Sequence, residues 1–310
     1  MKATRDGFGK RLLELGHKEN VIVLSADLSS PTKTDGFQKK YPERFFEVGI
    51  AENNMIGIAS GLAEYSSNRV IISSFAAFLT GKYESIRTSI GYSKSPVILV
   101  GTHGGLAIGR DGVTQMGLED ISLMRSIPDM MVLQPATSLQ SEKIIEFVIN
   151  NNLDYPVYLR LGRQPCIEVF DDSYEFTPTK VDVLEEGNDI TLFTSGCILS
   201  ETIKASSILK NNGINSTVIN ITTIKPLNVD SVIKYSKNKR MVCTIEDHSI
   251  IGGLGSAICE VLSENLPTKV IRFGLNDIFP ESGVPEELWR KYNLTGDKIA
   301  ANILRKINDK

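Results

Sequence analysis

The segment that decides the fold runs from Val70 to Gly101 and reads VIISSFAAFLTGKYESIRTSIGYSKSPVILVG. Its two ends, Val70–Ser73 and Val97–Gly101, are short apolar runs rich in Val and Ile, which is typical of buried strands. The stretch between them, Ala76–Ser93, has the spacing of an amphipathic helix. Apolar strands that alternate with helices in this way predict a parallel sheet that is covered by helices on both faces.

The same alternation continues in both directions along the chain. In the first half, further strands are predicted at Val21–Ser25, Met130–Gln134 and Pro156–Arg160, and helices at Ala51–Ala63, Leu118–Ser126 and Ser138–Asn150. In the second half, strands are predicted at Ile190–Thr194, Ser216–Ile221, Met241–Glu246 and Lys269–Phe273, and helices at Glu201–Asn211, Asp230–Lys237, Gly253–Glu264 and Pro285–Lys291. A polar passage that contains Pro separates the halves. We therefore expect an α/β fold of two tandem doubly wound domains, 1–170 and 186–310, joined by a linker at 171–185.

Composition narrows the classes of function. The chain has 34 Lys and Arg residues against 37 Asp and Glu residues, a net charge of -3. That balance argues against a nucleic-acid partner, because nucleic-acid binding needs a broad basic surface. No apolar run approaches the ~20 residues of a membrane span, and the first residues lack the apolar stretch of a signal peptide. We expect a cytoplasmic protein with no membrane partner.

The number and spacing of the cysteines and histidines argue against disulfides and against a metal site. No C-x-x-C pair occurs, and free thiols in a reducing cytosol are expected for all four cysteines: Cys166, Cys197, Cys243 and Cys259. Only three histidines are present, far apart in the sequence, so a multi-histidine metal site is not expected.

Glu52 stands at the start of a predicted helix, on the same face as Ile56, Ala59 and Ala63. A carboxylate on an apolar face is costly to bury ionised, so it should be paired or protonated. The N-terminus of a helix favours the anion instead. From the residues alone, a partly exposed carboxylate at a helix N-terminus is an equally good interpretation.

An ordered set of motifs resembles the transketolase family and covers essentially the whole chain. The motifs are Glu47–Met55 (EVGIAENNM), Ser74–Phe78 (SFAAF), Gly101–Gly105 (GTHGG), Gly109–Gln115 (GRDGVTQ), Leu161–Arg163 (LGR), Ile245–His248 (IEDH), Gly252–Gly255 (GGLG) and Asn276–Gly283 (NDIFPESG). The resemblance implies a domain that binds the pyrimidine of thiamine diphosphate over residues 1–170, followed by a transketolase C-terminal domain over residues 186–310.

The resemblance implies the residues that contact the cofactor. The carboxyl group of Glu52 would bond to the pyrimidine ring nitrogen and favour the imino tautomer, which accepts the proton of the thiazolium carbon. Phe78 and Phe75 would form the aromatic wall of the pyrimidine site, and Asp27 is a further cofactor contact. On their own, two Phe residues three apart are ordinary core aromatics.

The resemblance also implies the residues that contact the sugar. His103, which follows a strand and opens a glycine-rich loop, would contact the donor sugar and the cofactor. Gln115 takes the place of a His in many relatives, and Gln cannot shuttle protons. Asp111 would bond to a sugar hydroxyl. Arg163 would bind the substrate through its phosphate, and Thr32 is a further substrate contact.

Two other parts of the sequence bear on whether and where a phosphate group is bound. Pro31 replaces a Ser that helps hold the substrate phosphate in close relatives, and Pro offers neither a hydroxyl nor an N–H. The sequence therefore identifies neither the sugar pair nor its phosphorylation. The Glu246–His248 and Gly252–Gly255 segments, which precede a predicted helix, could cradle a phosphate, but we favour a packing role for them.

The segment with which this family binds its metal, Gly-Asp-Gly followed by an Asn, is not found in the sequence. The resemblance therefore implies one subunit of a split transketolase. Its partner would be the N-terminal, diphosphate-binding subunit, which would hold Mg²⁺ or Ca²⁺ and pair with this chain as a heterotetramer of two plus two. The alternatives are the beta subunit of a 2-oxo acid dehydrogenase decarboxylating component, a deoxyxylulose phosphate synthase-like enzyme and a non-catalytic scaffold.

Overall fold

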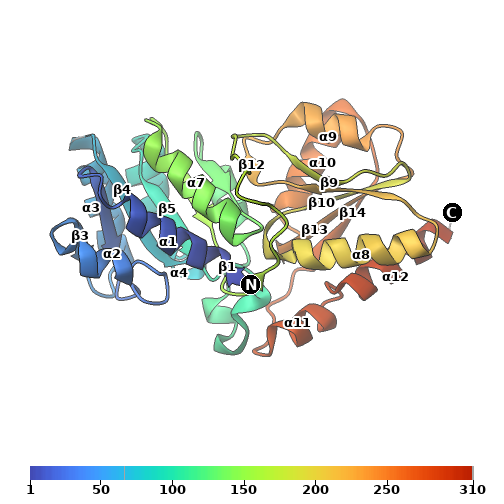
Figure 1. Cartoon of the computed structure of the whole chain (residues 1–310), viewed down its shortest axis with the longest axis horizontal. Helices are drawn as coiled ribbons and strands as arrows, with labels where there is room; N and C mark the ends of the chain where they lie inside the picture. The colour runs from blue at the N-terminus through green and yellow to red at the C-terminus, as the bar shows by residue number, and fades with distance from the viewer. Residues whose placement is uncertain (66, 309–310) are drawn as a thin grey trace.

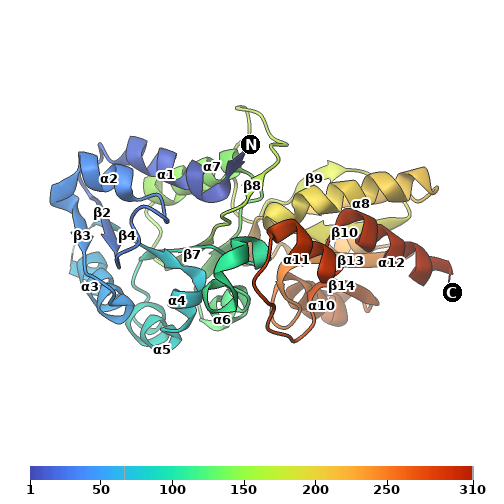
Figure 2. The same ribbon diagram turned by 90° about the horizontal axis from the view of Figure 1, so that it is seen from below.

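The computed structural model describes residues 1–65 and 67–308. The chain forms two mostly parallel β-sheets that lie side by side, each with helices on both faces (Figure 1, Figure 2). A separate pair of short strands joins the N-terminus to the middle of the chain. The architecture confirms the predicted α/β class with mostly parallel sheets.

The elements follow in chain order. The first half contains β1 (Lys2–Ala3), α1 (Thr4–Leu15), β2 (Val21–Ser25), α2 (Asp35–Lys40), η1 (Pro42–Arg44), β3 (Phe45–Glu47), α3 (Glu52–Tyr65), β4 (Arg69–Phe75), α4 (Ala76–Thr80), α5 (Tyr83–Ser85), η2 (Ile86–Tyr92), β5 (Ile98–Thr102), η3 (Leu106–Asp111), η4 (Val113–Gln115), α6 (Asp120–Ser126), β6 (Met131–Leu133), α7 (Ser138–Asn150), β7 (Val157–Arg160) and β8 (Pro165–Cys166). The second half contains β9 (Asp182–Glu185), β10 (Ile190–Thr194), η5 (Gly196–Ile198), α8 (Leu199–Asn211), β11 (Ser216–Asn220), β12 (Thr223–Lys225), α9 (Val229–Ser236), β13 (Met241–Ser249), α10 (Leu254–Asn265), β14 (Val270–Leu275), α11 (Pro285–Lys291) and α12 (Gly296–Asn308).

The first sheet has the strand order β12-β6-β7-β5-β4-β2-β3 and is parallel except at β12. Its strands are apolar along their length because both faces are covered. Helices α1 and α7 cover one face, where Phe8 and Ile145 pack on strand residues such as Val23. Helices α3 and α6 cover the other face, with Ile56 and Met124 in its core.

The second sheet has the strand order β14-β13-β10-β11-β9 and is parallel except at β9. Helices α8 and α12 cover one face, where Leu209 and Ile303 are buried, and α10 covers the other with Ile258 (Figure 2). The strand β12 leaves this half and pairs antiparallel with β6 at the edge of the first sheet. The two halves therefore share a sheet.

The predicted elements are present, with differences at particular places. The helix predicted over Ala76–Ser93 is divided into α4, α5 and the wide-turn helix η2, since α4 ends at Gly81. The predicted linker 171–185 contains β9, which pairs with β11, so the second sheet begins before residue 186. The domain boundaries themselves stay a prediction. The elements α1, α2, α12, β1, β3, β8, β9 and β12 were not predicted. The short elements among them carry little periodic signal, whereas the helices α1 and α12 were missed although they are 12 and 13 residues long.

The expectation of four free thiols is wrong for one pair. Cys166 of β8 and Cys197 of η5 form a disulfide, because the fold brings together two residues that are 31 positions apart in the sequence. Cys243 and Cys259 are free thiols. Over the described ranges, no helix combines the length and the apolar character needed to cross a membrane.

Candidate functional site

The predicted site residues gather at one edge of the first sheet, beyond the carboxyl ends of its parallel strands. Asp27 follows β2, Phe75 ends β4, His103 follows β5 and Arg163 follows β7. These four strands are neighbours in the order β7-β5-β4-β2, so their loops must meet. Such an edge is where parallel sheets place their ligands.

Glu52 is the first residue of α3 and is buried, with 7% of its surface exposed. Its predicted face is confirmed, because Ile56, Ala59 and Ala63 are buried beside it. The hydroxyl of Ser74 on β4 donates to Glu52 Oε1 over a long 3.5 Å. A buried carboxyl with so weak a partner has capacity for a stronger hydrogen bond.

Three rings form a continuous group that includes Phe75, the residue after the Ser74 that bonds to Glu52. The rings of Phe75 and Phe78 are stacked with centroids 5.2 Å apart and planes at 19°. The ring of Phe75 also lies 3.8 Å from that of His103. Phe75 is buried, whereas Phe78 is half-buried and presents a free part of its ring. Offset rings of this kind form a wall on which a flat heterocycle can stack.

The hydrogen bonds of His103 define its tautomer. Arg5 Nη1 lies 3.0 Å from His103 Nε2, and since a guanidinium can only donate, Nε2 is the acceptor. The proton is therefore on Nδ1, which donates to Thr102 Oγ1 at 2.8 Å. The hydroxyl of Thr102 in turn donates to the main-chain oxygen of Ser74 at 3.3 Å. Burial, and then the positive charges of Arg5 and Arg163, lower the pKa of His103 to about 3, so the ring is neutral at pH 7.

Arg5 is a site residue that the sequence did not reveal. It stands in the first turn of α1, and its Nη1 donates to the main-chain oxygen of Pro31 at 2.8 Å. Burial lowers the pKa of Arg5. The residue reaches the site because β1 pairs with β8, more than 160 positions along the chain. A two-residue strand gives no pattern from which that pairing could be predicted.

Arg163 and Asp111 were predicted to hold a phosphate and a sugar hydroxyl, and here they bind each other. Arg163 Nη1 lies 2.8 Å from Asp111 Oδ2, with both side chains about half exposed. Arg163 Nη1 also donates to the main-chain oxygen of Ile108 at 3.4 Å. An exposed ion pair of this kind is weak, so a substrate anion can compete for the guanidinium.

The remaining predicted residues differ in how far they are accessible. Asp27 is exposed, and its main-chain N–H donates to Glu47 Oε1 at 2.6 Å. Gln115 is half-buried at the end of η4. The side chain of Thr32 is fully buried, and its hydroxyl donates to the main-chain oxygen of Leu28 at 2.8 Å. The geometry therefore gives no support for Thr32 as a substrate ligand.

The Glu246–His248 segment lies at the amino end of α10. Glu246 accepts the N–H groups of Leu254 at 2.7 Å and Gly255 at 2.9 Å, so its carboxyl group fills the place where a phosphate would sit. Burial raises the pKa of Glu246 to about 7. The arrangement agrees with the packing role that the sequence favoured.

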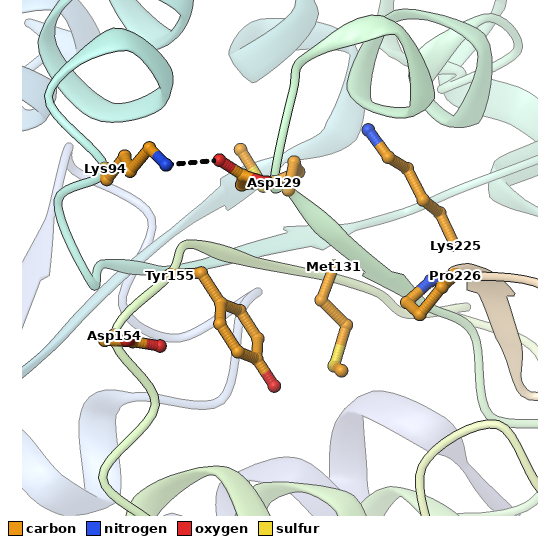
Figure 3. A pocket seen from close by; sticks show the side chains of 8 residues that line it. Lys94, Asp129, Met131, Asp154, Tyr155, Lys225 and Pro226 are labelled. Atoms are coloured by element: carbon orange, nitrogen blue, oxygen red, sulfur yellow. Dashed lines mark ion pairs between the residues drawn. The ribbon is translucent and has the colours of Figure 1, made fainter.

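A pocket of about 520 Å³ lies at the opposite edge of the first sheet (Figure 3). Most of its lining residues lie at the beginnings of β5, β6 and β7, and Lys225 and Pro226 lie at the end of β12. Lys94 and Asp129 form an ion pair of 2.9 Å across one side. Nζ of Lys225 is bonded to the main-chain oxygen of Arg125 at 2.9 Å. The pocket is separate from the site residues, which follow the strands. Within residues 1–65 and 67–308, no group of three acidic, His or Cys side chains could hold a metal ion.

Comparisons with known proteins agree with this geometry. Residues 1–166 match the family model described as transketolase, pyrimidine binding domain, and residues 179–299 match transketolase, C-terminal domain. A chain of Methanocaldococcus jannaschii described as a transketolase C-terminal section is 42% identical over 311 residues, covering 99% of this chain and 96% of its own length.

Two further relatives are similar over nearly their whole length. The 6-deoxy-6-sulfo-D-fructose transketolase subunit SqwH of a Clostridium species is 36% identical, covering 95% of this chain and 91% of its own length. A solved structure described as a split gene transketolase, inactive beta4 tetramer, superposes with a TM-score of 0.91 at 39% identity and covers 99% of both chains. The protein whose chain places Glu52, Phe75 and His103 at one sheet edge belongs to the transketolase family.

Proposed function

We propose that this chain is the pyrimidine-binding subunit of a split, thiamine-diphosphate-dependent transketolase, which transfers a two-carbon ketol unit from a ketose to an aldose. The observation that carries the proposal is that Ser74 of β4 contacts the weakly bonded, buried carboxyl group of Glu52, while the next residue, Phe75, lies in a group of rings with Phe78 and His103. When bound, thiamine diphosphate supplies the carbon nucleophile that cleaves the ketose next to its carbonyl group.

The residues present fit the pyrimidine half of that cofactor. A ring nitrogen of an aminopyrimidine needs a buried carboxyl group that has no strong competing partner, and the 3.5 Å contact of Glu52 with Ser74 meets this condition. Its flat ring needs an aromatic neighbour, and the half-buried ring of Phe78 is the accessible member of the stacked pair. Glu52 would bind and orient the ring, and Phe78 would exclude water from one side of it.

His103, Arg5 and Arg163 would bind the sugar substrate. Neutral His103 holds a lone pair on Nε2, which can accept a hydrogen bond from a substrate hydroxyl once the hydrogen bond from Arg5 is released. Arg5 and Arg163 each lie close enough to His103 to lower its pKa, so two guanidinium groups flank the same place. We propose that they receive a terminal anion of the sugar, a phosphate or a sulfonate. The name of the Clostridium relative, a sulfofructose transketolase subunit, supports an anionic sugar without specifying this chain's substrate.

The proposal includes a partner. The similar solved structure carries the description of an inactive assembly of beta chains from a split gene, which supports the view that this chain also needs a second subunit. That subunit would bind the cofactor's diphosphate through Mg²⁺ or Ca²⁺ and would form a heterotetramer of two plus two with this chain. The proposal places this assembly in the cytoplasm.

Calorimetry on the purified chain, with and without the candidate partner, tests the proposal. We expect weak binding of thiamine diphosphate to the chain alone, and tight binding that depends on magnesium once the partner is added. Given a ketose phosphate or sulfonate and an acceptor aldose, the reconstituted pair should convert the ketose into an aldose two carbons shorter and the acceptor into a ketose two carbons longer. Tight, magnesium-dependent binding to the chain alone would refute the need for a partner.

A further inference from the structure

A buried polar cluster joins the two halves beneath the glycine-rich loop, residues 103–118. Arg160 of β7 pairs with Asp120 of α6 at 2.8 Å, and both side chains are buried. The guanidinium also donates to two main-chain oxygens, that of Gly117 in the loop at 2.8 Å and that of Asp247 in β13 at 3.0 Å. The cluster therefore contacts the loop and the second half of the chain at the same time.

The side chain of Asp247 binds the loop directly. The main-chain N–H of Leu106 donates to Asp247 Oδ1 at 2.9 Å. The preceding residue, Gly105, has a φ of +88°, and a Cβ atom there would lie only 2.2 Å from Asp247 Oδ2. Only Gly allows the loop backbone to approach the carboxylate so closely. The start of the loop thus rests on a side chain from the other half of the protein.

Asp247 lies within a local irregularity of β13. The pairing of β13 with β14 shifts register between Ile245 and Ser249. Irregularities of this kind bend a strand and change the direction of its side chains. Asp247 is 6% exposed. Although burial opposes it, the negative charges of Asp120 and then Asp247 raise the pKa of Arg160, so the carboxylate of Asp247 belongs to the buried cluster.

The loop that Asp247 binds carries three of the proposed sugar contacts. His103 lies three residues before Leu106, and Asp111 and Gln115 follow it. His103 itself has a φ of +60°, a conformation that a residue other than Gly keeps only when its surroundings fix it. The bond to Leu106 supplies part of that constraint from outside the first half.

We infer that Asp247 is a positioning residue for the sugar site, and that the second half of the chain thereby sets the geometry of the catalytic loop. Asp247 acts through the Leu106 N–H and the Gly105 backbone, not by contact with the reacting atoms. The consequence for sugar binding rests on the proposed function, whereas the ordering of the loop does not.

Hydrogen exchange on the chain alone tests the ordering of the loop. Asp247→Ala should speed exchange at least tenfold in peptides from residues 103–118, and leave α3 unchanged. The matched control is Asp182→Ala, because Asp182 is also a buried carboxylate that links the halves, accepting from Gln140 Nε2 at 2.7 Å, but lies outside this cluster. Unchanged exchange in the loop of Asp247→Ala, or equal acceleration in both variants, would overturn the inference. Asp247→Ser, whose side chain is one atom shorter, replaces Asp247→Ala if the latter does not fold.

Kinetics of the pair with its partner subunit tests the consequence for sugar binding. Asp247→Ala should raise the KM for the ketose about tenfold or more and change the Kd for thiamine diphosphate much less, since Glu52 and Phe78, the proposed pyrimidine contacts, lie outside the loop. Asp247→Asn keeps an oxygen acceptor for the Leu106 N–H and should restore KM to within about threefold. Equal loss in both Asp247 variants, or weakened cofactor binding with an unchanged KM, would refute the positioning role. Failure of the proposed function would leave the exchange result standing.

Discussion

At the scale of single residues, the site depends on how few partners its buried polar groups have. Glu52 is buried with one hydrogen bond of 3.5 Å, and His103 is buried in a neutral form whose tautomer is set by Arg5 and Thr102. Both groups are held in a state that a ligand can use.

Glu52→Gln should abolish turnover by the reconstituted enzyme while leaving the fold intact. The amide cannot hand a proton to the pyrimidine, so proton loss from the cofactor's thiazolium carbon should slow at least a hundredfold, about 3 kcal/mol of barrier. Hydrogen–deuterium exchange at that carbon measures the effect. Glu64→Gln, at the exposed end of the same helix, is the control and should exchange as the unmodified protein does. Exchange at the normal rate in Glu52→Gln would remove Glu52 from this role.

His103 should make the protein less stable in acid. Its pKa is about 3 in the folded protein against an ordinary value of 6.5, so the unfolded chain binds the extra proton between these values. Stability from this group is complete above pH 6.5 and is lost as pH falls, by about 1.4 kcal/mol per pH unit. His103→Asn should reduce the slope of unfolding free energy between pH 5 and 6 by that amount, as measured by urea unfolding. Groups common to both proteins, such as Glu246, cancel in the difference. Equal slopes would contradict the assignment.

The residues of the site could be predicted to different degrees. Glu52 was predicted as a candidate cofactor contact for two reasons. A carboxylate is unusual on an apolar helix face, and the motif around it resembles that of transketolases. Arg5 could not be predicted, because its place depends on a two-residue strand pairing with a distant one. Asp247 was missed for a similar reason, since its partner Leu106 is 141 positions away.

At the scale of elements, the disulfide connects β8 with η5 and holds the segment that carries Arg163. In denaturant without reductant, we expect a thiol reagent to titrate two cysteines, Cys243 and Cys259, and after reduction four. Cys197→Ser should lower the free energy of unfolding by about 2–4 kcal/mol, whereas Cys259→Ser should change it little. Four reactive thiols without reductant would show that the pair is reduced in solution.

The elements themselves were largely predictable, because long strands and helices repeat their apolar residues with a fixed period. Val21–Ser25, Ser138–Asn150, Ile190–Thr194 and Pro285–Lys291 have the bounds that their patterns predicted. The short elements were not predicted, nor were the longer helices α1 and α12, and neither was the division of the helix over Ala76–Ser93. Sheet edges such as β12 and β9 are defined by their partners and not by their own sequence.

At the scale of the whole molecule, strand pairing, hydrogen bonds and a common core hold the two halves together, in addition to the segment of chain that connects them. The strand β12 completes the first sheet, and Gln140 of α7 bonds to Asp182 and to Thr222 at 2.7 and 2.9 Å across the boundary. Ile224 of β12 is buried in a core that extends through both sheets.

We therefore expect one cooperative unfolding transition for the whole chain. Ile224→Ala should lower its stability by about 2–5 kcal/mol and shift the loss of structure in both halves together. Hydrogen exchange in increasing denaturant, followed separately in peptides of β5 and of β10, measures this coupling. Two well-separated transitions, with only one moved by the substitution, would contradict it.

The shared strand also has an evolutionary consequence. The two family models divide this chain into two modules, residues 1–166 and 179–299. A recombination event at the boundary would, however, transplant β12 and leave β6 behind. A hybrid gene could yield a stable protein only if the incoming edge strand matched the host's β6 in register and in apolar residues. Natural exchange of these modules should thus be restricted to genes whose proteins are already similar in the paired strands β12 and β6.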